Sequence, residues 1–212
     1  LLSYDEWIKG FPEEYDFPDN LDERDPALIC YTSATTGLPK GVVYTQRSVI
    51  LHFMTVGLTF GIHESDCLLH CVPMFHVNAW GAPFGAVALG CKQVLPGREM
   101  LNMEKVCRII ADEKVSFTSG VPTIWIMLFD YLEKGGWHDF STLQMIVTGG
   151  PASPPPLMRG LNEKSGSPVR QAYGMTETSP LALPAVPKSD MAGWPEARLF
   201  ALKTSTGLPA WG

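Results

Sequence analysis

A ten-residue run near the start of the chain has the composition of a phosphate-binding loop. Residues 32–41 read Thr-Ser-Ala-Thr-Thr-Gly-Leu-Pro-Lys-Gly, with four hydroxyl side chains and no acidic residue. Hydroxyls, the backbone N–H groups of turns and a lysine ammonium are donors that bind anionic phosphate oxygens. The run is not a Walker A loop, because Lys40 is followed by Gly41 rather than by Ser or Thr. Its position between two apolar strands favours a polyphosphate site over a flexible surface loop.

Two further apolar runs also end in turns rich in glycine and hydroxyl groups. Residues 143–147 are followed by Thr-Gly-Gly-Pro (148–151), and residues 169–172 by Tyr-Gly-Met-Thr-Glu (173–177). Ligands of open α/β sheets bind at the carboxyl ends of parallel strands. We therefore expect all three segments to lie at such strand ends.

The elements that position these segments follow from the hydrophobic pattern. Short β-like runs alternate with longer helical patterns, which is typical of βαβ units. Strands are predicted at residues 27–32, 67–72, 92–95, 115–119, 143–147 and 169–172, and helices at 47–60, 79–89, 103–113, 122–132 and 155–164. The prediction is an α/β fold with a parallel-sheet βαβ core over residues 27–212, which the family resemblance described below implies is incomplete at both ends. Residues 1–26, acidic and rich in proline and aromatic residues, are predicted to form a strap that leads into this domain.

The overall composition is that of a globular protein of 212 residues, with 45% apolar and 18% charged residues. Its net charge of −6 excludes the electrostatic footprint of a non-specific nucleic-acid binder. The five cysteines are odd in number and contain no CxxC spacing, which favours reduced thiols in a cytoplasmic protein. The first residues do not have the pattern of a signal peptide.

Residues 67–91 contain no charged side chain over 25 positions. That length admits a transmembrane helix, but two prolines and three other polar residues favour a strand, a loop and a short buried helix. Cys67, His70 and Cys71 within this run suggest a metal site. An apolar strand with alternating faces is the better interpretation, because a second ligand pair at zinc spacing is missing from the sequence.

Four segments together resemble, in order and spacing, the motifs of the adenylate-forming (ANL) superfamily. They are residues 32–41, Pro-Met-Phe-His-Val-Asn-Ala-Trp-Gly at 73–81, residues 143–154 and Tyr-Gly-Met-Thr-Glu at 173–177. The likeness covers essentially the whole chain and is greatest to AMP-forming medium- and long-chain fatty acyl-CoA synthetases. Ala34 stands where the family usually has glycine, and the added methyl restricts the loop without removing a donor.

The resemblance implies a role for each motif. Lys40 and its loop would hold the β- and γ-phosphates of ATP, with the loop residues Thr32, Ser33, Thr35, Thr36 and Gly37. The nucleotide would also contact Gly149, Gly150, Pro151, Tyr173 and Gly174. Thr176 would hydrogen-bond the α-phosphate, and Glu177 would bind Mg²⁺; with Lys40 these are the expected catalytic residues. His76 and Trp80 would line the entrance of the acyl tunnel, where Trp80 would act as a gate.

Each of these residues also has a purely structural interpretation. Thr176 and Glu177 fit a helix N-cap with an acidic first turn. Tyr173 fits a core aromatic residue at a strand end, and His76 and Trp80 fit ordinary packing in an apolar stretch.

The resemblance implies a fatty acid–CoA ligase that forms an acyl-adenylate and then transfers the acyl group to coenzyme A. The implied cofactors and co-substrates are ATP, Mg²⁺ and coenzyme A. The implied partners are small molecules, with no nucleic acid and no integral membrane segment, and a homodimer is an expected form of the full-length protein. The ribose-binding Asp, the hinge and the small C-terminal domain with its adenylation lysine fall outside these residues, so we expect a partial AMP-binding domain that is inactive alone. The alternatives are an aryl or thioether acid CoA ligase, a luciferase-like oxygenase, and a nucleotide-binding module without catalysis.

Overall fold

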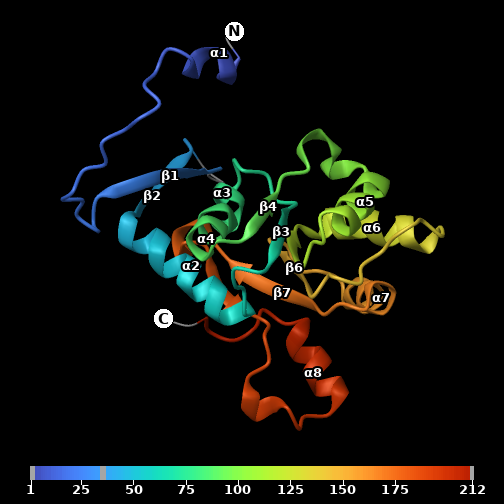
Figure 1. Cartoon of the computed structure of the whole chain (residues 1–212). Helices are drawn as coiled ribbons and strands as arrows, with labels where there is room; N and C mark the ends of the chain where they lie inside the picture. Colours follow the sequence, from blue (N-terminus) through green and yellow to red (C-terminus); the bar gives the residue numbers. More distant parts are fainter. Residues whose placement is uncertain (1–2, 34–36, 211–212) are drawn as a thin grey trace.

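The computed structural model describes residues 3–33 and 37–210 and shows an α/β domain with a separate β-hairpin (Figure 1). Its main sheet has six strands in the order β4-β3-β5-β6-β7-β8. The strands are β3 (Cys67–His70), β4 (Lys92–Val94), β5 (Phe117–Gly120), β6 (Met145–Gly149), β7 (Val169–Gly174) and β8 (Leu181–Pro184). All neighbours are parallel except β7 and β8, which are antiparallel. The predicted parallel βαβ core is therefore confirmed.

Helices cover both faces of this sheet (Figure 1). One face packs against α5 (Met103–Asp112), α6 (Pro122–Glu133) and α7 (Pro155–Ser165), around the fully buried Trp125 and Ile146. The other face packs against α2 (Gln46–Phe60) and α4 (Ala82–Leu89) through a smaller cluster that includes Phe60 and Phe117. The helices begin and end within a few residues of their predicted bounds.

The first predicted strand differs from the prediction in its pairing. β1 (Pro26–Thr32) and β2 (Lys40–Thr45) form a two-stranded antiparallel sheet, with Thr32 opposite Lys40. The described parts of the run, residues 32–33 and 37–41, therefore belong to an antiparallel hairpin and do not follow a parallel strand. The physical reason is that a parallel connection needs a crossover of a dozen or more residues, whereas β2 begins eight positions after β1 ends.

The uncharged run 67–91 forms β3, the one-turn α3 (Val77–Trp80) and α4. No helix among the described residues has the length and apolarity to cross a membrane. The helix predicted at 79–89 begins only at Ala82, because the residues before it adopt a left-handed turn that ends at Gly81. Side chains of β3 alternate as expected: Cys67 and Leu69 enter one core cluster, and Leu68 enters the other.

The chain after β8 returns along the free edge of that strand. It passes through η3 (Ser189–Met191) and α8 (Glu196–Lys203) before the backbone N–H groups of Leu208 and Ala210 donate to the carbonyls of Pro184 and Ala182, at 3.1 and 2.8 Å. The remaining elements are η1 (Gly97–Leu101), η2 (Thr176–Thr178) and α1 (Tyr4–Ile8), which precedes the hairpin. Residues 5–25 of this leading segment are exposed.

Candidate active site

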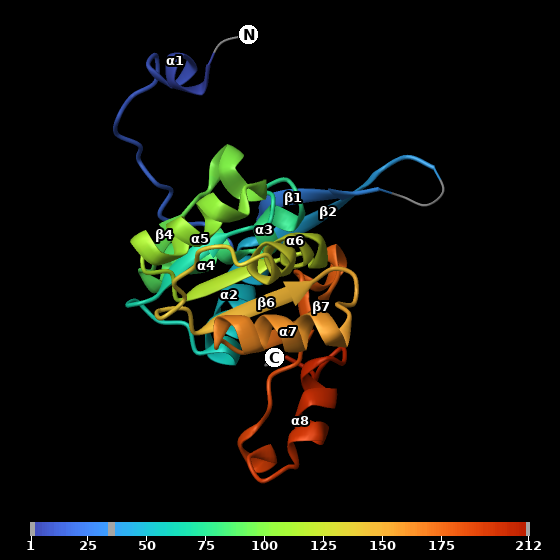
Figure 2. The same cartoon turned by 90° about the vertical axis from the view of Figure 1, so that its right-hand side faces the viewer.

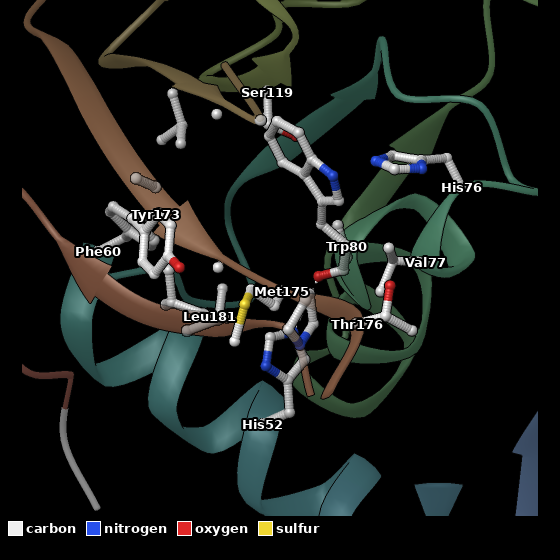
Figure 3. A pocket seen from close by; sticks show the side chains of 18 of the residues that line it. His52, Phe60, His76, Val77, Trp80, Ser119, Tyr173, Met175, Thr176 and Leu181 are labelled. Atoms are coloured by element: carbon white, nitrogen blue, oxygen red, sulfur yellow. Dashed lines mark hydrogen bonds between the residues drawn. The ribbon is translucent and has the colours of Figure 1, made fainter. Parts of the chain in front are cut away.

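A cavity of about 240 Å³ lies at the carboxyl ends of β5, β6 and β7 (Figure 3). Helix α2 and the turn before α4 form its other walls. Its lining is mostly apolar and consists of His52, Val56, Phe60, His76, Val77, Trp80, Ala82, Phe117, Ser119, Val147, Gly149, Gly150, Ala172, Tyr173, Gly174, Met175, Thr176, Pro180 and Leu181. This is the location at which open α/β sheets bind ligands.

The cavity brings together seven of the residues singled out in the sequence. They are His76, Trp80, Gly149, Gly150, Tyr173, Gly174 and Thr176. Both predicted acyl residues and five of the predicted nucleotide residues therefore line one space. Among the described candidates, Thr32, Ser33, Gly37, Lys40, Pro151 and Glu177 do not line it. Thr35 and Thr36 lie outside the described residues.

The hairpin that bears Lys40 extends away from the main sheet (Figure 2). Gly37 and Lys40 are exposed near its tip, and the Thr32 hydroxyl donates a long hydrogen bond of 3.5 Å to the Lys40 carbonyl. At the base of the hairpin, the buried Tyr44 hydroxyl donates to the backbone carbonyl of Thr176. The hairpin that bears Lys40 and the Thr-Glu motif are thus joined directly.

The glycine-rich turn after β6 is held by buried polar groups. The hydroxyls of Thr148 and Ser153 lie 2.6 Å apart, and the Ser153 backbone N–H donates to the Gln171 side-chain oxygen at 3.0 Å. These bonds connect Ser153, at the end of the turn, to both β6 and β7. Sequence reasoning gave Ser153 and Gln171 no role, although buried polar residues beside a Gly-Gly turn are a usable signal.

Gly149 faces the indole of Trp80. A Cβ on Gly149 would lie 3.0 Å from the Trp80 Cη2 atom and 3.0 Å from the Ala172 carbonyl oxygen. The missing side chain therefore makes room for the indole in this structure.

Gly174 is required by close packing of two backbones. A Cβ at this position would lie 2.1 Å from the carbonyl oxygen of Pro180, on the antiparallel segment that leads into β8. The residues between them form η2, which presents Thr176 to the cavity while Glu177 is exposed. The Thr-Glu motif thus lies in the turn between β7 and β8. Thr176 is not the N-cap of η2, because Met175 holds that position, but Glu177 does lie in its first turn, as the structural interpretation expects.

His52 is the clearest functional candidate that the sequence did not reveal. It is 8% exposed, lines the cavity from α2, and its Nε2 atom lies 2.8 Å from the backbone carbonyl oxygen of Trp80. Burial lowers the pKa of His52, so the ring is neutral near pH 7. Ser119, at the end of β5, also lines the cavity, and no sequence motif marks it. Figure 3 shows the indole of Trp80 directed toward it.

The cysteines do not offer a nucleophile at this site. All five are free and buried, and burial raises the pKa of each thiol, to about 11 for Cys71. His70 points away from Cys67 and Cys71 toward Gln93, whose side-chain oxygen is 2.9 Å from its Nε2 atom. The described residues hold no group of three or more His, Cys, Asp and Glu side chains suited to a metal ion.

Comparison with known proteins identifies the family. The model of the family described as AMP-binding enzyme matches residues 3–212. The chain is 44% identical over 210 residues to a long-chain-fatty-acid–CoA ligase of Thermus thermophilus, covering 98% of this chain and 38% of that relative. It is 38% identical over 214 residues to a medium-chain-fatty-acid–CoA ligase of Ectopseudomonas oleovorans, covering 100% of this chain and 39% of that relative.

A solved structure has the same architecture. The o-succinylbenzoate coenzyme A synthetase of Bacillus subtilis, in complex with ATP and a magnesium ion, superposes with a TM-score of 0.79 at 30% identity. The match covers 98% of this chain and 40% of that chain. The chain thus spans about two fifths of the length of the proteins it matches.

Proposed function

Because this chain belongs to the family of AMP-binding enzymes, we propose that its protein activates a fatty or similarly apolar carboxylic acid with ATP and transfers the acyl group to coenzyme A. The supporting observation is the cavity. Its walls are largely apolar, and the Gly-Gly turn and Thr176 border the same space. An acid chain and a reacting phosphate both find suitable surroundings there.

In the first half-reaction, a carboxylate oxygen attacks the α-phosphorus of ATP, and the bond to the pyrophosphate oxygen breaks. Both reactants are anions, so their approach needs charge neutralisation and fixed orientation. In the proposal, the Thr176 hydroxyl donates to an α-phosphate oxygen. Lys40 and the hydroxyls of the hairpin loop hold the departing pyrophosphate.

In the second half-reaction, the thiol of coenzyme A loses its proton to water, and the sulfur attacks the acyl carbonyl carbon. The bond between that carbon and the AMP oxygen breaks, and AMP leaves with the electron pair. The apolar side chains Phe60, Phe117 and Leu181 would keep the acyl chain away from water during both steps.

The Glu177 carboxylate is proposed as a ligand of Mg²⁺. Oxygen ligands suit this hard cation, and the exposed Glu177 follows directly after the cavity residue Thr176. When bound, Mg²⁺ would neutralise charge on the phosphate oxygens. We also assign the protein to the cytoplasm, where ATP and coenzyme A are present and where buried free thiols remain reduced.

ATP–pyrophosphate exchange in the full-length protein tests this function. The panel would contain fatty acids of several chain lengths, a thioether acid and an aryl acid. We expect the highest exchange with a fatty acid, and formation of its acyl-CoA when coenzyme A is added. A preference for the thioether or aryl acid would indicate another ligase of the family, and binding of ATP without any exchange would indicate a nucleotide-binding module.

A further inference from the structure

The turn that carries Trp80 has an unusual backbone. Four consecutive residues other than glycine, from Val77 to Trp80, have φ angles of 46°, 48°, 52° and 59°. The left-handed region costs an L-residue about 1–2 kcal/mol, so such a turn persists only where its surroundings fix it. Whatever fixes the turn also sets the position of the Trp80 indole in the cavity.

Contacts within the turn and at its outer side account for part of this support. The Ala79 N–H donates to the His76 carbonyl at 3.0 Å, and the Gly81 N–H donates to the Asn78 carbonyl at 3.1 Å. Val77 packs against the base of the hairpin in a cluster with Cys30 and Tyr44. None of these three contacts involves the carbonyl of Trp80.

The Trp80 carbonyl is bound by His52 from α2, 28 positions earlier in the chain. With the ring neutral, the tautomer that carries hydrogen on Nε2 donates across the 2.8 Å separation. The ring is buried, so the Trp80 carbonyl would lose a partner in a dry environment if His52 were removed.

Gly81 shows that the turn and the histidine are fitted to each other. A Cβ on Gly81 would lie 2.4 Å from Cδ2 and 2.5 Å from Nε2 of His52. The imidazole thus fills the space that any side chain at position 81 would need. Gly81 also has a φ of 71°, which favours glycine independently.

We propose that His52 is a positioning residue for the acid substrate: by holding the Trp80 carbonyl, it fixes the left-handed turn and the place of the indole in the cavity. The identity of the ligand rests on the proposed function, but the position of the indole does not. Removing the donor releases the turn. This release affects the binding of the acid, through the space left in the cavity, more than it affects the binding of ATP.

The first test follows the indole without requiring activity. The full-length protein is used. The emission spectrum of Trp80 is obtained by subtracting the spectrum of the Trp80→Phe variant from that of the protein with Trp80. We expect His52→Ala and His52→Leu to shift this difference spectrum and increase its quenching by acrylamide. His52→Gln retains an N–H donor and should preserve it, as should His138→Ala, which removes an exposed histidine that also contacts a backbone carbonyl. An unchanged difference spectrum in both His52→Ala and His52→Leu contradicts the proposal.

The second test measures the two Michaelis constants. We expect His52→Leu to raise KM for the fatty acid about fivefold, because one hydrogen bond is lost, and to change KM for ATP less than twofold. His52→Gln should keep both constants near the values of the parent protein. If His52→Leu and His52→Gln both change KM for the fatty acid and KM for ATP to the same extent, His52 serves packing alone. If the parent protein activates none of the acids, the proposed function fails, and the fluorescence test still decides the role of His52.

Discussion

The hydroxyl of Tyr44 donates a hydrogen bond to the backbone carbonyl of Thr176, 132 positions later in the chain. Tyr44 belongs to the hairpin that bears Lys40, and Thr176 belongs to the motif that borders the cavity. Burial raises the pKa of Tyr44 far above its usual range, so the phenol keeps its proton and remains a donor near neutral pH. This hydrogen bond therefore holds the hairpin and the Thr176 motif, the two parts of the proposed phosphate site, in a fixed relative position.

Tyr44→Phe should loosen this arrangement. We expect ATP–pyrophosphate exchange to fall about fivefold, with a higher KM for ATP, because one hydrogen bond of about 1 kcal/mol is lost at a buried carbonyl. Tyr31→Phe on the same hairpin is the matched control, since Tyr31 is 72% exposed. Equal kinetics for the two variants would show that the hydrogen bond does not contribute to catalysis.

Glu177→Ala should reduce turnover in the adenylation half-reaction at least tenfold, about 1.4 kcal/mol of barrier, because a proposed Mg²⁺ ligand is lost. The activity should recover in part at higher Mg²⁺ concentration. Glu163→Ala, an exposed carboxylate on α7, should have no effect. Normal exchange at low Mg²⁺ in a folded Glu177→Ala protein would remove Glu177 from the metal site.

Trp80→Ala should change the dependence on fatty acid and leave KM for ATP nearly unchanged, because the indole occupies the cavity beside Gly149. Steady-state kinetics with acids of different chain length measure this effect. A parallel loss of affinity for both substrates together with a lower melting temperature would instead identify Trp80 as a packing residue.

Gly174→Ala should destabilise the protein by about 1–3 kcal/mol, since the new methyl group would overlap the Pro180 carbonyl and force the β7–β8 connection apart. Thermal unfolding of the full-length protein measures this loss. Gly193→Ala is the control, because no atom lies within 4 Å of its added Cβ. Similar melting temperatures for the two variants would mean that the connection adjusts without cost.

The sequence predicted the helices well where hydrophobic periodicity was strong, as in α5. It also placed the Gly-Gly turn and Tyr173 at the ends of parallel strands, where the structure has them. The pairing direction of β1 was wrong, because local pattern does not encode which strand is the neighbour.

The left-handed turn and His52 were also beyond local reasoning. Val77 and Ala79 carry no preference for positive φ, so their backbone is imposed by tertiary contacts. His52 lies in a helix whose pattern is satisfied without it, and its partner is a backbone carbonyl, which no sequence pattern marks. The roles of all the predicted site residues stay predictions, for those that line the cavity and for those that do not.

The return of residues 207–210 along β8 has a consequence for the behaviour of the protein in solution. A sheet edge with unpaired N–H and C=O groups is a template for strands of other molecules. Leu208 and Ala210 occupy that template on β8, and β4 at the opposite edge has three residues. A version of the chain ended at Thr206 would uncover the β8 edge, and its main hazard would be edge-to-edge aggregation rather than unfolding.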